Sequence, residues 1–124
     1  MLNAYAGELL IVVIGGQRRA VPMERIAEVR IHYGATRIPG APPWIHGFVE
    51  RSGAPVEVFD AAQRLGIGAL HLTPRSCLLF FESAAMLVEG VDRIVAADSC
   101  EEPVLDLEEF FGSAVPAVMA GGWS

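Results

Sequence analysis

Apolar and polar residues follow one another in short blocks that are typical of β-strands. An apolar run at Leu9–Ile14 stops at the pair Gly15-Gly16, and Ala20-Val21 resumes it. This pattern predicts a buried strand, a turn and a short partner strand. Pro22 then ends the pairing, because proline has no backbone donor.

The same block pattern continues through the rest of the chain. After Pro22, a single helical turn leads into the next strand. Further strands are predicted at Ile26–Ile31, Ile45–Glu50, Val56–Phe59, Cys77–Phe81 and Met86–Val88. The proline-rich stretch 39–43 and the stretch 67–75 are loops. The predicted fold class is all-β, with only short helices.

Two short helices share one capping pattern. An aspartate, Asp60 or Asp106, precedes each predicted helix, and Gly66 or Gly112 follows it. Turn geometry with positive φ is expected at Gly47, Gly53, Gly66 and Gly90. The tail, residues 113–124, is expected to be loosely held.

The chain repeats one plan twice. Two apolar strands followed by Met23-Glu24-Arg25-Ile26 in the first half correspond to two apolar strands followed by Val91-Asp92-Arg93-Ile94 in the second. Pro55-Val56 before the first capped helix likewise corresponds to Pro103-Val104 before the second. The two halves therefore predict two small barrels, with accidental matching of short elements as the alternative.

Composition narrows the function classes. Hydrophobic residues make up 52% of the 124 residues and charged residues 19%, against about 25% charged in an average soluble domain. Either some apolar surface meets a partner or ordinary exposed aliphatic residues account for it. The net charge of −6 arises entirely within residues 98–109, and a neutral body with an acidic segment is expected to bind nucleic acid poorly.

Residue types that perform chemistry form no constellation. His32, His46 and His71 are scattered without a second ligand at metal spacing, and Cys77 and Cys100 make no pattern. We therefore expect no catalytic residue, no metal and no cofactor. Without a signal peptide or a run long enough to span a membrane, the chain is expected to be cytoplasmic and not inserted in a membrane.

Several motifs occur together along the chain. They are Val21-Pro22-Met23-Glu24-Arg25-Ile26-Ala27-Glu28-Val29-Arg30, Thr36-Arg37-Ile38-Pro39, Pro42, Ile45-His46-Gly47, the stretch 47–60, Val88-Glu89-Gly90-Val91-Asp92-Arg93-Ile94 and Val104-Leu105-Asp106-Leu107. With these motifs, the chain resembles the CheW-like family of bacterial chemotaxis coupling proteins from about Leu9 to Phe111.

The resemblance implies a single domain over residues 1–124, built from two SH3-like five-stranded β-barrels that share a core. The first barrel would cover about 8–66, and an incomplete second barrel with its helix would cover about 76–112. The implied function is to bridge the cytoplasmic tip of a methyl-accepting chemoreceptor and a CheA-type histidine kinase.

The resemblance also implies two sets of contact residues. The receptor would bind near Ile26 and the turn formed by Arg51, Ser52 and Gly53. The kinase would bind Glu28, Val29 and Arg30, although Glu28 and Arg30 are equally well interpreted as ordinary outward-facing strand positions.

Two departures from the family pattern matter. Ser52 stands where the family places an arginine before the turn glycine, and Arg51 lies one residue earlier, which reverses its face in a strand. Only residues 95–103 separate Ile94 from Val104, where the family carries a longer segment with additional strands.

These departures lead to two further hypotheses, about array formation and about self-association. The shortened barrel predicts coupling without an extended kinase array, and its open edge predicts closure by a second copy in a strand-exchanged homodimer. The alternatives are a decoy that binds the kinase alone and, from another class, a small ligand-binding barrel or enzyme.

Overall fold

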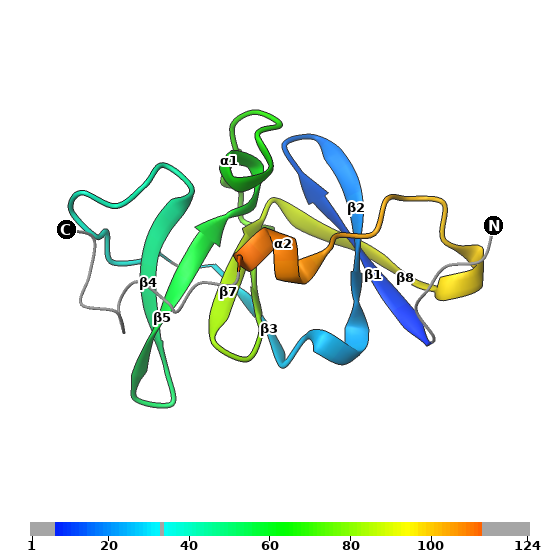
Figure 1. Ribbon diagram of the computed structural model, residues 1–124, viewed down its shortest axis with the longest axis horizontal. Helices are drawn as coiled ribbons and strands as arrows, with labels where there is room; N and C mark the ends of the chain where they lie inside the picture. The colour runs from blue at the N-terminus through cyan, green and yellow to red at the C-terminus, as the bar shows by residue number, and fades with distance from the viewer. Residues whose placement is uncertain (1–6, 33, 113–124) are drawn as a thin grey trace.

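The computed structural model describes residues 7–32 and 34–112, whose strands form two sheets (Figure 1). The strands are β1 Glu8–Ile14, β2 Gln17–Pro22, β3 Glu28–Ile31, β4 Ile45–Arg51, β5 Ala54–Asp60, β6 Cys77–Phe80, β7 Ala84–Val88 and β8 Gly90–Ala96. The helices are α1 Ala61–Leu65 and α2 Leu107–Phe111, with 3₁₀ turns η1 Met23–Arg25 and η2 Ala97–Ser99. The predicted fold class, mainly β with short helices, is confirmed. The predicted tail, residues 113–124, lies outside the described residues.

The predicted hairpins and helix caps form where local sequence signals place them. β1 and β2 pair across Gly15 and Gly16, which have φ of 57° and 78°. The backbone N–H of Gln63 donates to Asp60 at 3.0 Å, and that of Glu109 donates to Asp106 at 3.1 Å. Each aspartate therefore satisfies a free amide in the first turn of its helix.

The two sequence halves exchange their third strands. β3 from the first half pairs with β6 from the second, and β8 from the second half pairs with β1 from the first. The resulting sheets have the orders β2-β1-β8 and β3-β6-β7-β5-β4. Each sheet therefore contains strands from both halves, so neither half is an independent structural unit.

The halves also correspond in their parallel pairing. In the five-stranded sheet, β5 runs parallel to β7. The corresponding pairing beside the three-stranded sheet is one parallel bridge between Ala20 of β2 and Val104. Ala20 N–H donates to the Pro103 carbonyl at 2.8 Å, and Leu105 N–H donates to the Ala20 carbonyl at 2.9 Å. Within the described residues the pairing does not extend beyond this bridge, and the smaller sheet has no counterpart of the β4–β5 hairpin there.

The five-stranded sheet curls until its two edge strands, β3 and β4, approach each other. Thr36, just after β3, forms an isolated antiparallel bridge with Phe48 of β4. Within the described residues this bridge does not extend into a ladder, and no closed barrel forms in either sheet. The predicted barrels are thus open sheets, because a single bridge leaves a seam in one and the other lacks two strands.

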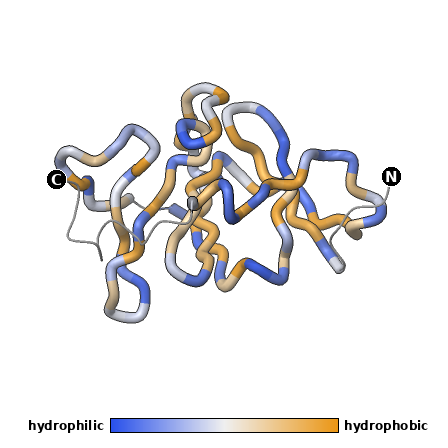
Figure 2. The backbone as a smooth tube through the Cα atoms, viewed as in Figure 1, coloured by the Kyte–Doolittle hydropathy of each residue, from blue (hydrophilic) through white to orange (hydrophobic). Residues whose placement is uncertain are grey.

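The buried residues form three clusters, and the largest of them joins the two sheets. The largest contains side chains of both sheets and both helices, among them Leu10, Val12, Leu79, Phe59 and Phe110. A second cluster fills the concave side of the five-stranded sheet, and a third lies between the three-stranded sheet and residues 97–104. Figure 2 shows the corresponding hydrophobic stretches along the strands in the middle of the molecule.

β8 is a strand that the sequence pattern did not predict. Its register with β1 shifts between Ile11, which pairs with Arg93, and Val12, which pairs with Val91. The shift inserts Asp92 as a bulge, which interrupts the usual alternation of faces. The prediction of a positive φ at Gly90 is wrong, because Gly90 is not among the glycines with positive φ.

Candidate protein-binding surface

Glu28, Arg30 and Arg51 form one cluster over the ring of Phe80, which we call the Glu28 cluster. Arg51 Nε donates to Glu28 Oε1 at 2.9 Å, and Arg30 Nε donates to Glu28 Oε2 at 3.2 Å. The two guanidinium carbons lie 4.6 Å and 5.3 Å from the centroid of the Phe80 ring, within cation–π range. Glu28 and Arg51 come from opposite edge strands, so curling of the sheet brings them together.

The cluster is charged and about one-third exposed. The Arg51 and Arg30 guanidinium groups lower the pKa of Glu28, so this carboxylate stays ionised at neutral pH. Between 31% and 37% of each of the three side chains is exposed. Two cations and one anion leave a net positive charge, and ion pairs exposed to this extent contribute little to stability.

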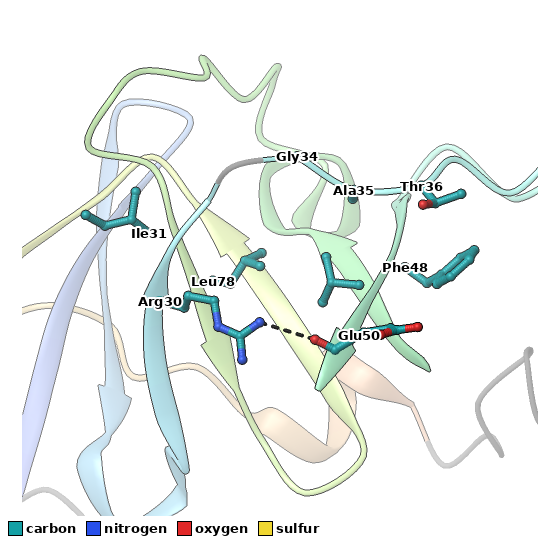
Figure 3. A pocket seen from close by; sticks show the side chains of 9 residues that line it. Arg30, Ile31, Gly34, Ala35, Thr36, Phe48, Glu50 and Leu78 are labelled. Atoms are coloured by element: carbon teal, nitrogen blue, oxygen red, sulfur yellow. Dashed lines mark hydrogen bonds between the residues drawn. The ribbon is translucent and has the colours of Figure 1, made fainter. Parts of the chain in front are cut away.

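A pocket of about 480 Å³ opens beside the cluster along the seam between β3 and β4 (Figure 3). Its lining includes Arg30, Ile31, Thr36, Phe48 and Glu50. Arg30 Nη1 donates across the seam to the Glu50 carbonyl at 3.3 Å. Side chains rather than main-chain pairing therefore span this part of the sheet.

The residues predicted to bind the kinase lie on two faces of β3. Glu28 pairs with Phe80 and Arg30 with Leu78, so both lie on the concave face. Val29 pairs with Leu79, lies on the opposite face and is 47% exposed. Its neighbour on that face, Ile31, is 49% exposed.

The residues predicted to bind the receptor are also separated. Arg51 belongs to the Glu28 cluster, whereas Ser52 and Gly53 form the exposed tip of the β4–β5 hairpin with φ of 54° and 81°. Ile26 is half-buried against the largest core cluster. Sequence reasoning assigned Arg51 and Glu28 to different partners, but they are in direct contact.

Sequence reasoning missed a second exposed apolar surface, on β8. Val91 is 40% exposed and Ile94 is 50% exposed. Their β1 partners, Val12 and Leu10, both belong to the largest core cluster, so the bulge places Val91 and Ile94 on one face. The only sequence signal was the apolar–acidic–basic–apolar order at 91–94, which resembles no regular strand.

Two of the three histidines, considered scattered in the sequence, lie together. The rings of His32 and His46 are 5.1 Å apart between centroids in an edge-to-face arrangement. Burial lowers the pKa of both imidazoles, so both are neutral at neutral pH. Among the described residues, no group of three or more His, Cys, Asp or Glu side chains is placed to hold a metal ion.

Sheet edges, a partly exposed charge cluster and exposed aliphatic residues characterise this small β-sheet module, and such features are typical of protein-binding surfaces. Within residues 7–32 and 34–112, no helix is long and apolar enough to cross a membrane. The chain belongs to the CheW-like domain family, whose model matches residues 8–103.

Individual relatives agree with this family. The chain is 28% identical over 126 residues to the probable chemotaxis protein CheW of Rhizobium etli, covering 94% of this chain and 81% of that protein. It is 28% identical over 109 residues to the chemotaxis protein CheW of Rhizobium meliloti, covering 84% of this chain and 70% of that protein.

A solved structure shares the fold. The scaffolding protein TtCheW of Thermoanaerobacter tengcongensis superposes with a TM-score of 0.71 at 21% identity, over 78% of this chain. The chain spans 66% of that protein's length. The comparisons together support a CheW-like scaffold role in chemotaxis.

Proposed function

We propose that this chain is a non-enzymatic scaffold that couples the cytoplasmic tip of a chemoreceptor to a CheA-type histidine kinase. The family membership and the chemotaxis relatives support the pathway. The observation that carries the proposal is the Glu28 cluster, whose charges are held in place by one another and remain partly open to a partner.

The kinase surface in this proposal comprises Glu28, Val29 and Arg30. Val29 offers apolar area on one face of an edge strand, while Glu28 and Arg30 offer fixed charges on the other. Burial of Val29 would supply affinity, and the oriented charges would select the partner.

The receptor surface comprises Ile26 and the hairpin residues Arg51, Ser52 and Gly53. Arg51 donates a hydrogen bond to Glu28, so contact with a receptor requires Arg51 either to break this bond or to bind Glu28 and the receptor at the same time. This competition favours the second candidate function, a decoy that binds the kinase and leaves the receptor unbound.

The shortened second half defines a further part of the proposal. Among the described residues, the three-stranded sheet has the Ala20–Val104 bridge where the five-stranded sheet has two further strands. We propose that the scaffold therefore engages one kinase without building an extended array. Its other proposed partner is a second copy of itself.

Binding to the regulatory domain of the cognate kinase tests the proposal. Glu28→Arg places three guanidinium groups together, so we expect at least about a tenfold weaker complex by calorimetry. Glu101→Arg, an equal change of charge at an exposed position in the acidic segment, is the matched control and should leave the affinity within about twofold.

Thermal unfolding of both variants separates lost binding from lost folding. Unchanged affinity of a folded Glu28→Arg variant would contradict the proposed kinase surface. A pull-down with kinase and receptor together then separates the candidates, because a scaffold retains both proteins and a decoy retains the kinase alone.

A further inference from the structure

Within the described residues β8 is a free sheet edge, unlike its counterpart β3. Both are edge strands in their sheets. The free side of β3 faces β4 across the seam, where Arg30 and the Thr36–Phe48 bridge occupy the gap. The described residues contain no strand opposite β8, and β8 residues 91–95 form backbone hydrogen bonds only within their own sheet.

The bulge gives β8 two chemically distinct faces. Val91 and Ile94 lie on the face of Leu10 and Val12. Arg93 lies on the other face with Ile11, where Asp92 meets Arg18 at 3.0 Å and Arg93 at 2.7 Å. Without the bulge, residues three apart in a strand would point to opposite faces.

From this arrangement we propose that β8 pairs antiparallel with β8 of a second copy, about a two-fold axis between Asp92 and Arg93. In this register each Val91 lies opposite the partner copy's Ile94, and each Asp92 lies opposite the partner copy's Arg93. Opposite residues in an antiparallel pair share a face, so apolar meets apolar on one face and acid meets base on the other.

Charge distinguishes β8 from the other free edge of the same sheet. The open part of β2 carries Arg18 and Arg19, so self-pairing there would place cations opposite cations. Pro103–Leu105 also blocks β2 at Ala20. The self-complementary order at 91–94 thus selects β8 as the dimer edge, with a second copy as its occupant.

The charges of β8 remain available for a partner. The Asp92 side chain is 32% exposed and that of Arg93 is 47% exposed, although Arg93 also pairs with Glu102 at 2.7 Å. A carboxylate has acceptor sites for more than two donors, so Asp92 can accept from the partner copy while retaining Arg18. Because the contact is one strand pair, we expect a weak dimer with a dissociation constant in the micromolar range.

Charge exchange between two variants tests the register. Asp92→Arg alone and Arg93→Asp alone each place like charges opposite one another, so each variant should self-associate at least about tenfold more weakly than the natural chain in sedimentation equilibrium. An equimolar mixture of the two variants places opposite charges together and should form a heterodimer. Circular dichroism verifies that both variants fold.

A matched pair of apolar variants tests the edge. Ile94→Glu should weaken self-association at least about tenfold, whereas Ile31→Glu, at an equally exposed position on β3, should leave it unchanged. A natural chain that stays monomeric up to about 1 mM overturns the proposal, since micromolar affinity predicts mostly dimer there. A folded mixture that fails to associate, or stronger disruption by Ile31→Glu, also overturns it.

Discussion

Gly47 determines how closely β4 approaches the segment that follows β3. Its φ of 155° is one that other residues rarely adopt, and a Cβ atom there would overlap the Thr36 carbonyl oxygen. That oxygen accepts a hydrogen bond from Phe48 N–H at 2.8 Å, and Thr36 N–H donates to the Phe48 carbonyl at 2.9 Å. The glycine therefore permits the bridge that draws the edges of the larger sheet together.

We expect Gly47→Ala to lower the free energy of unfolding by about 2 to 3 kcal/mol, because it adds backbone strain and a clash with fixed backbone. Urea unfolding measures this change. Gly66→Ala is the control: its φ is 68° but nothing lies within 4 Å of an added Cβ, so about 1 kcal/mol is expected. Equal losses would show that the approach to Thr36 is unimportant.

Several residue-level features were readable from the sequence because their causes are local. Asp60 and Asp106 cap helices, and Gly53 and Gly66 have positive φ, since turns and helix ends are specified within a few residues. The contact of Arg51 with Glu28 was not readable, because it depends on curling of a whole sheet.

Glu89 connects three chain segments at the element scale. Its carboxylate accepts from the backbone N–H of Gly16 at 2.9 Å, from that of His71 at 2.8 Å, and contacts His71 Nδ1 at 3.1 Å. Burial raises its pKa, but the hydrogen bonds from His71 and Gly16 outweigh burial, so its net pKa is lowered. The ionised side chain thus ties the β7–β8 junction to the β1–β2 turn and to the loop before β6.

This lowered pKa predicts acid sensitivity. A carboxyl group with a folded-state pKa below its unfolded value stabilises the fold above the unfolded pKa, and that contribution disappears as pH falls through the folded pKa. We expect Glu89→Gln to reduce the unfolding free energy at pH 7 by about 1 to 2 kcal/mol, and the deficit to shrink toward pH 3. Chemical unfolding measured across this range checks it.

Glu82→Gln, in the exposed β6–β7 turn, is the matched control and should change little at any pH. A Glu89→Gln deficit that stays constant from pH 7 to pH 3 would mean that charge plays no part in the connection.

The elements themselves were predictable to different degrees. Hairpins such as β4–β5 were predicted because apolar blocks and turn glycines specify them locally. β8 was missed because its bulge hides the alternation, and the exchange of β3 and β8 between halves was missed because strand pairing over long sequence distances leaves no local signal.

At the scale of the whole molecule, the two sheets offer unequal opportunities for assembly. The larger sheet has five strands, and the smaller sheet has three and a single bridge. A two-fold contact through β8 would use the same surface on both copies, so it closes after two chains and cannot propagate.

If the proposed kinase and receptor are its partners, we expect mixtures of this chain with both proteins to form discrete complexes and no hexagonal lattice. Electron microscopy of the mixture checks this, with a pull-down from the same sample confirming that the partners are bound. Extended hexagonal rings would contradict the proposal that the shortened half prevents array growth.

The exchange of third strands also affects how the protein acquires its fold during synthesis. β1 obtains its second neighbour only when residues 90–96 have left the ribosome, and β3 must wait for β6. Until then the nascent chain exposes unpaired apolar strands. Folding is thus deferred until translation has passed β8, and chaperones that shield emerging chains have the most to protect in that interval.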